Sequence, residues 1–158
     1  MKDYGENMRV AIGTDHAGFP LKKHVVETVR LCGHEVLDLG IFIEEKADYP
    51  DYAQKVGDAI ISGTADRGIL LCGSGVGVCI AANKILGIYA SVCHDTYSAH
   101  QGVEHDGMNV LCMGGRIIGP ELAMDIVKTF LSAKFIESDN YIRRVNKIKA
   151  IESKNQES

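Results

Sequence analysis

Residues 68–77 read Gly-Ile-Leu-Leu-Cys-Gly-Ser-Gly-Val-Gly. The apolar run that ends in Cys72 predicts a buried strand, and the alternating glycines after it predict a tight turn. The small residues of 78–84 then predict the start of a helix. A turn of this kind presents backbone N–H groups to an anion, and the field of a helix N-terminus favours the thiolate of Cys72. The segment therefore offers an anion cradle beside a candidate acid–base group, although a buried core thiol is the usual role of a cysteine.

Four further apolar runs, each closed by glycine, cysteine or a polar turn, predict four more strands. They cover residues 9–13, 35–39, 88–93 and 109–113. Stretches of helical period lie between the strands, such as the one that carries Leu21, Val25, Val29 and Cys32. Near-continuous apolar strands indicate burial on both faces, so the chain is expected to form a parallel sheet with helices on both sides, an α/β fold.

Length and composition indicate a single domain with a full hydrophobic core. The chain has 158 residues, and we expect one domain over residues 8–153 after a flexible, polar extension at residues 1–7. The net charge of −4 gives no reason to expect nucleic-acid binding, and no stretch is apolar enough for a membrane span. The five cysteines form no Cys-x-x-Cys pair, which is typical of reduced thiols in the cytoplasm rather than of a disulfide framework or a zinc site.

The C-terminal segment, residues 140–153, predicts a charged helix with Ile142, Val145 and Ile148 on one side. Such a helix either packs on a second subunit or covers its own domain. The pattern alone leaves both possibilities open.

The carboxyl ends of the predicted strands are where an open α/β sheet binds its ligand. Polar residues follow four of the strands, at positions 14–16, 72–75, 94–95 and 114–116. They supply carboxylates, imidazoles, a thiol, a hydroxyl and an arginine, a set that suits a small anionic molecule. The Gly-Lys-Ser/Thr of a nucleotide-binding P-loop is absent, and Val78 stands where a dinucleotide fingerprint requires glycine, so dinucleotide binding with Asp95 at the ribose is a minor alternative.

Three polar residues of the chain, Asp15, Tyr49 and His105, also have a purely structural interpretation. Asp15 can bind a ligand or cap a helix, and Tyr49, before a proline, can be a rigid turn residue. On pattern alone His105 is more simply a histidine of a surface loop.

Several linked motifs resemble the ribose-5-phosphate isomerase B family, whose wider superfamily includes galactose-6-phosphate isomerase subunits. The resemblance extends over residues 8–152 and implies a Rossmann-like three-layer α/β/α sandwich with a five-stranded parallel sheet. It also implies a homodimer or tetramer, with sites at the subunit interface and the helix of residues 140–153 at the dimer interface. The motifs that carry it are Gly13–Phe19, Asp48–Pro50, Cys72–Gly77, Ala81–Lys84 and Asn109–Leu111.

By this resemblance Cys72 is the base that moves a proton between C1 and C2 of the open-chain sugar. The Ser74 hydroxyl and the N–H groups of the following loop stabilise the enediolate oxygen. No metal ion and no cofactor are implied. The loop residues concerned are Gly73, Gly75, Val76 and Gly77.

The same resemblance gives roles to the other polar residues. His105 matches the histidine that opens the furanose ring, Asp15 would bind sugar hydroxyls, and Tyr49 would line the pocket. The substrate phosphate is assigned to three cationic side chains, those of His16, Arg116 and Arg144.

Two positions on the substrate side depart from the family pattern. Asp106 replaces an asparagine, and an ionised carboxylate cannot donate a hydrogen bond. Asn140 replaces the first of two phosphate-binding arginines, and Arg143 lies about 100° around the helix from the surviving Arg144. These changes put the identity of the sugar in question.

The expected function is a cytoplasmic, metal-independent aldose–ketose isomerase that interconverts ribose 5-phosphate and ribulose 5-phosphate, the pair of the pentose phosphate pathway. One alternative keeps the chemistry with a tetrose or hexose phosphate or a less charged sugar. Another is a non-catalytic module that binds a sugar phosphate or a nucleotide.

Overall fold

The computed structural model describes residues 7–156, which form five strands and six helices. All strands are parallel and pair in the order β2-β1-β3-β5-β4. The predicted α/β fold with a five-stranded parallel sheet is therefore confirmed. The elements are β1 (Arg9–Thr14), α1 (Phe19–Leu31), β2 (Glu35–Asp38), α2 (Tyr49–Ile61), β3 (Arg67–Cys72), α3 (Val76–Ala82), β4 (Ala90–Val92), α4 (Thr96–Asp106), β5 (Val110–Gly114), α5 (Pro120–Ser132) and α6 (Asp139–Lys154).

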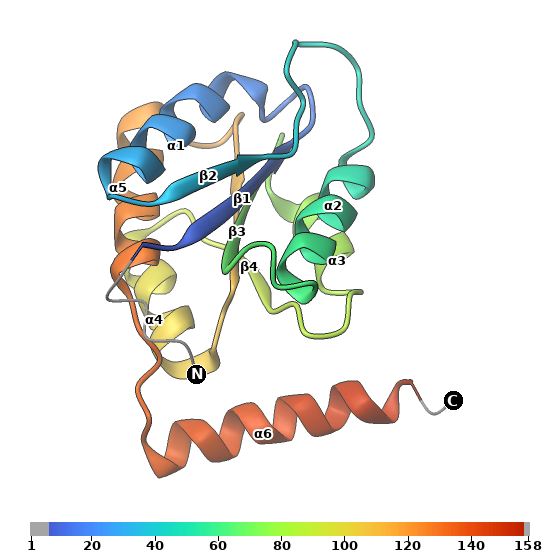
Figure 1. Cartoon of the computed structure of the whole chain (residues 1–158), viewed down its shortest axis with the longest axis vertical. Coiled ribbons are helices and arrows are strands. Elements are labelled where there is room, and N and C mark those ends of the chain that lie inside the picture. Colours follow the sequence, from blue (N-terminus) through green and yellow to red (C-terminus); the bar gives the residue numbers. More distant parts are fainter. Residues whose placement is uncertain (1–6, 157–158) are drawn as a thin grey trace.

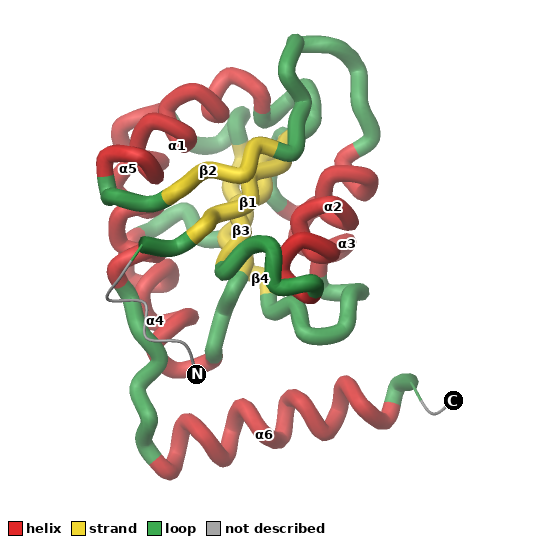
Figure 2. The backbone as a smooth tube through the Cα atoms, viewed as in Figure 1, coloured by secondary structure: helices red, strands yellow, loops and turns green. Residues whose placement is uncertain are grey.

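Helices cover both faces of the sheet, as Figures 1 and 2 show, with α1 and α5 on one side and α2 and α3 on the other. Successive side chains of a strand point to opposite faces, so Val10 and Ile12 join the core under α1, α4 and α5, while Ala11 joins the core under α2 and α3. The chain is thus a three-layer α/β/α sandwich with two apolar cores.

The predicted burial of strands on both faces is correct for β1, β3 and β5 and wrong for β2 and β4, which lie at the two edges of the sheet and are partly exposed. β4 is also shorter than the predicted 88–93. The side-chain amide of Asn83 donates to the carbonyl of Ala90 at 2.9 Å and accepts from its N–H at 2.8 Å, so it occupies the backbone groups of Ala90 at this edge.

The helical period of Leu21, Val25, Val29 and Cys32 marks the core face of α1 with one exception. Leu21, Val25 and Val29 are buried. Cys32 lies just beyond the end of α1 and is half-buried.

Helix α6 follows the predicted helix of residues 140–153 but lies apart from the rest of the domain (Figure 1). None of its 16 residues is buried. The segment that leads into α6 is joined to α4 by the Ile136 N–H, which donates to the Glu104 carbonyl at 2.9 Å. Among the described residues no helix has the length and apolarity of a membrane span. Most of the predicted flexible extension, residues 1–6, lies outside the described residues.

Candidate active site

The carboxyl ends of β1, β3 and β5 meet at one edge of the sheet, as the sequence predicts. The N–H of Asp15 donates to the carbonyl of Leu71 at 3.3 Å, and that of Gly115 donates to the carbonyl of Cys72 at 2.8 Å. The N–H of Arg116 reaches the carbonyl of Gly73 at 3.0 Å. These backbone bonds hold the predicted site residues of three strands against one another.

Cys72 ends β3 and is held by the loop that follows it. The N–H of Gly75 donates to Cys72 Sγ at 3.1 Å, and the side chain is 4% exposed. Gly75 has φ +80°, and a Cβ there would come within 3.0 Å of the Met113 backbone, so only glycine fits. The turn thus orients the sulfur with a backbone donor.

Two of the backbone N–H groups in the loop after Cys72 donate within the loop, that of Gly75 to Cys72 Sγ and that of Val76 to Ser74 Oγ. Ser74 is exposed and its Oγ accepts from the N–H of Val76 at 3.3 Å. The N–H of Cys79 donates to the carbonyl of Gly75, as in a regular helix. The N–H of Gly77 lies in the first turn, where backbone donors have no partner within the helix. The predicted strand–turn–helix is therefore confirmed.

Asp15 and His16 lie at the end of β1. Asp15 is buried, and its Oδ1 accepts from the N–H groups of Ala17 and Gly18 at 2.9 and 3.0 Å, so the carboxylate does cap the turn that leads into α1. His16 Nδ1 accepts from the Ala47 N–H at 3.3 Å, which leaves Nε2 for a ligand. His16 also lines a polar cavity of about 470 Å³ beside the β2–α2 loop.

Tyr49 and Arg116 close over the glycine loop from two sides. Tyr49 begins α2, and a Cβ on Gly77 would lie 2.8 Å from its ring. A Cβ on Gly73 would lie 3.5 Å from Arg116 Nη1. The ring of Tyr49 and the exposed guanidinium of Arg116 therefore flank the glycine loop, an arrangement that suits a small anionic substrate.

His94 follows β4, among the polar residues expected at the strand ends, although the family resemblance gives it no role. Its Nε2 accepts from the Gly114 N–H at 2.9 Å, so it ties the end of β4 to the end of β5. Burial lowers the pKa of His94, against the opposing effect of Asp95. Asp95 accepts from the Ser98 N–H at 2.6 Å and caps α4, which is a structural role in place of the ribose contact considered above.

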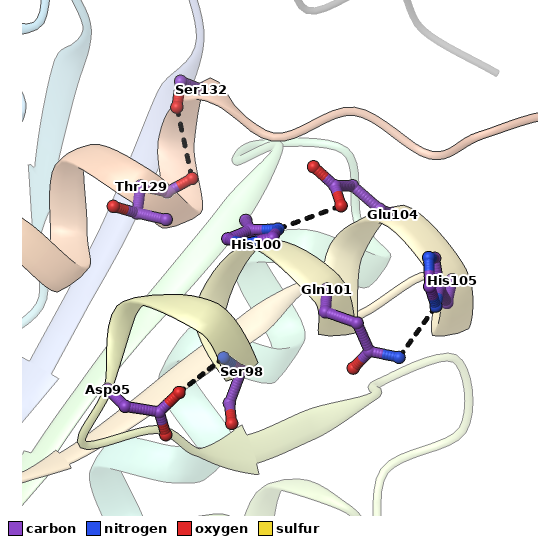
Figure 3. Close-up of polar contacts among 8 residues, drawn as sticks. All are labelled: Asp95, Ser98, His100, Gln101, Glu104, His105, Thr129 and Ser132. Carbon is purple, nitrogen blue, oxygen red and sulfur yellow. Dashed lines mark hydrogen bonds and ion pairs between the residues drawn. The ribbon is translucent and has the colours of Figure 1, made fainter.

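A second group of predicted residues gathers where α4 meets α6. His105 lies in the last turn of α4, not in a loop, and its Nδ1 is 2.8 Å from Gln101 Nε2 (Figure 3). Its ring stacks on Tyr141 of α6 with centroids 4.1 Å apart. The other members, Asp106, Asn140 and Arg144, are exposed.

The two groups lie at opposite ends of the strands. Figure 3 shows Asp95 and His105 near opposite ends of α4, which has 11 residues and a length of about 16 Å. Asp95 follows β4 at the carboxyl ends of the strands, where Cys72 also lies, whereas His105 lies shortly before the start of β5. Within one chain, therefore, the structure does not bring His105, Asp106, Asn140 and Arg144 to Cys72.

All five cysteines are free thiols, and three of them besides Cys72 lie near the sheet. A hydrogen bond from the Cys112 thiol lowers the pKa of Cys79 to about 7, against the effect of burial. The same contact, together with burial, raises the pKa of Cys112, and burial raises that of Cys93. Among the described residues no three His, Cys, Asp or Glu side chains are grouped to hold a metal ion.

Comparison with known proteins gives consistent matches. Residues 10–148 match the family described as Ribose/Galactose Isomerase. The chain is 45% identical over 146 residues to ribose-5-phosphate isomerase B of Escherichia coli (92% of this chain, 97% of the relative). It is 42% identical over 142 residues to D-erythrulose-4-phosphate isomerase of Pectobacterium atrosepticum (89% and 93%). The solved structure of ribose-5-phosphate isomerase B from Mycoplasma genitalium with bound ribulose-5-phosphate superposes with a TM-score of 0.86 at 38% identity (92% and 96%).

Proposed function

This chain belongs to the ribose/galactose isomerase family, and we propose that it interconverts ribose 5-phosphate and ribulose 5-phosphate with Cys72 as the base. The observation that carries the proposal is the Cys72 thiol at the end of β3, which is oriented by the Gly75 N–H and followed by the glycine loop of residues 73–77. The M. genitalium relative holds ribulose-5-phosphate in the same fold, which supports this substrate pair.

The proposed reaction is a proton shuttle. The Cys72 thiolate takes the proton from C2 of the open-chain aldose, and the carbonyl oxygen O1 becomes the oxyanion of an enediolate. The Gly73–Gly77 loop and the Ser74 hydroxyl stabilise this charge. The thiol then returns the proton to C1, O2 becomes the ketose carbonyl, and the proton of O2 has passed to O1. Asp15 and Tyr49 contact the sugar.

We infer that the active protein is a homodimer, or a pair of dimers, in which each site takes residues from two chains. Cys72 lies at the carboxyl ends of the strands and His105 lies near their amino ends. A two-fold axis between two chains can bring the carboxyl ends of each sheet against the amino ends of the partner's sheet. His105 would then open the furanose ring, while Arg144 joins His16 and Arg116 at the phosphate. Helix α6, with no buried residue, supplies a surface for the partner.

The direct test is the initial rate of ketose formation from ribose 5-phosphate with a chelator present. We expect a turnover of about 1–1,000 per second that is insensitive to the chelator, because a thiol base and backbone donors supply the acid–base and electrostatic needs of the reaction. A negligible rate from folded protein would contradict the proposal. The absence of disulfide bonds among the five cysteines supports the proposed cytoplasmic location, and the proposed substrate pair would belong to the pentose phosphate pathway.

A second candidate is an isomerase for a tetrose or hexose phosphate. Asp106 and Asn140 favour it, because loss of an arginine–phosphate bond costs about 1.5–3 kcal/mol unless it is replaced. The D-erythrulose-4-phosphate isomerase of P. atrosepticum is a similar relative. A substrate panel separates the two, since ribose 5-phosphate should have the highest kcat/KM under the first proposal. A non-catalytic module would bind the sugar without exchanging its C2 proton with solvent.

A further inference from the structure

The loop before β4 is held by side chains from two distant segments. Glu152 of α6 accepts from the Gly87 N–H at 2.8 Å with Oε1 and from the Tyr89 hydroxyl at 2.7 Å with Oε2. From the other side, Asn109 accepts from the Tyr89 N–H at 2.8 Å and donates to the Gly87 carbonyl at 2.9 Å. We call the two bonds of Glu152 the Glu152 latch.

The middle of α6 is not packed on the domain between its two ends. A cavity of about 650 Å³ separates the helix from the amino ends of the strands. Ile142, Val145 and Lys149 line its α6 side. At one end of the helix His105 stacks on Tyr141, and near the other end Glu152 forms the latch. Figure 1 shows α6 crossing below the sheet as a separate rod. The direction of such a rod depends on how its ends are held.

We propose that Glu152, through Tyr89 and Gly87, is a positioning residue that sets the direction of α6 and hence the place of Arg144 at the substrate phosphate. The inference rests on the proposed function, in which Arg144 binds the phosphate in the partner's site. In this proposal Glu152 itself contacts neither the substrate nor the reacting atoms.

A small tilt of α6 would displace Arg144 far enough to change phosphate binding measurably. Glu152 lies about 21 Å and Arg144 about 9 Å from Ser138, the cap at the start of the helix. A tilt of about 10° about that end would move Arg144 by about 1.6 Å. A displacement of this size exceeds the spread of about 0.5 Å in the length of a good hydrogen bond, so it would weaken the charge-assisted bond of Arg144 to the phosphate.

The test uses Glu152→Ala, Tyr89→Phe and the double variant, each in the whole 158-residue chain. We expect the KM for ribose 5-phosphate to rise about 5-fold with kcat within about twofold of the unaltered chain, since only phosphate binding is weakened. The inhibition constant of inorganic phosphate should rise by the same factor. The KM of the double variant should be no higher than that of Glu152→Ala alone, because the bond of the Tyr89 hydroxyl is already lost in that single variant. Ser153→Ala, which removes a bond to Lys149 within α6, is the matched control and should change neither constant.

Unchanged KM and phosphate inhibition in folded variants of unaltered oligomeric state would overturn the proposal. A fall in kcat at constant KM would also overturn it, because that pattern places Glu152 in the chemical step. If the unaltered chain does not isomerise ribose 5-phosphate, the proposed function fails separately. Calorimetric titration of inorganic phosphate into the same variants then decides the role of the latch, with weaker binding expected and equal binding contradicting it.

Discussion

At the scale of single residues, the position of Cys72 depends on its neighbours rather than on its own side chain. The Gly75 N–H donates to its sulfur, and Gly75 can do so only because it adopts φ +80° against the Met113 backbone. Cys72 is the only one of the five thiols that terminates a strand next to a glycine loop. The chemistry proposed here therefore depends on two positions that lie three residues apart, Cys72 and Gly75.

Cys72→Ala should lower kcat by about 10²–10⁴-fold, the usual contribution of a general base, while the protein stays folded. Cys32→Ala removes a half-buried thiol at the end of α1 and should leave kcat unchanged. The measurement is kcat by a ketose assay together with thermal unfolding. A fully active Cys72→Ala variant would contradict the assignment of the base.

Gly75→Ala should destabilise the protein more than Gly63→Ala. Both glycines have φ +80°, which costs a residue with a Cβ about 1–2 kcal/mol, but a Cβ at Gly63 meets open space. At Gly75 the added carbon would lie 3.0 Å from Met113, so the cost should be clearly larger and activity should fall as Cys72 is displaced. Denaturant unfolding of the two variants measures the difference, and equal free energies of unfolding would show that the contact is relieved.

At the scale of elements, the ends of β3, β4 and β5 are joined by a short chain of contacts. His94 connects β4 to Gly114, and Gly115 connects β5 back to Cys72. The imidazole can accept from the Gly114 N–H only when Nε2 is unprotonated. The carboxyl edge of the sheet therefore contains a group that responds to mild acid.

The stability of the protein should fall as the pH drops below about 6.5, because the folded pKa of His94 lies below its usual value. The unfolded chain then binds more protons, so the contribution is present above that pH and is lost below it. His94→Gln keeps an acceptor that does not titrate and should flatten the fall in unfolding free energy between about pH 7 and 5. Some slope should remain from His34, whose pKa is also lowered.

His24→Gln is the matched control for this prediction, since His24 lies on the partly exposed face of α1. It should preserve the acid-dependent loss of stability. An equal slope in the His94→Gln variant and the unaltered chain would show that His94 contributes nothing to the pH dependence.

At the scale of the whole molecule, the separation of Cys72 from His105 predicts complementation between inactive chains. In a dimer with shared sites, a Cys72→Ala chain paired with a His105→Ala chain forms one intact site and one doubly altered site. Equal mixing gives half heterodimers, so about a quarter of the unaltered activity should return. The measurement is ribose 5-phosphate isomerisation after co-refolding of the two chains, and activity equal to the mean of the two separate variants would contradict shared sites.

The sequence by itself determined the layers of the fold and one half of the candidate site. Apolar runs and helical periods are local signals, and the carboxyl ends of parallel strands must share an edge, so Asp15, Cys72 and Arg116 could be grouped before any coordinates. Only the tertiary structure decided that β2 and β4 are edge strands, that Asp15 caps a turn, and that His94 supports Gly114. It also decided that His105 and Arg144 lie across the sheet from Cys72. These facts depend on which segments meet in space, and neither periodicity nor motif spacing contains that information.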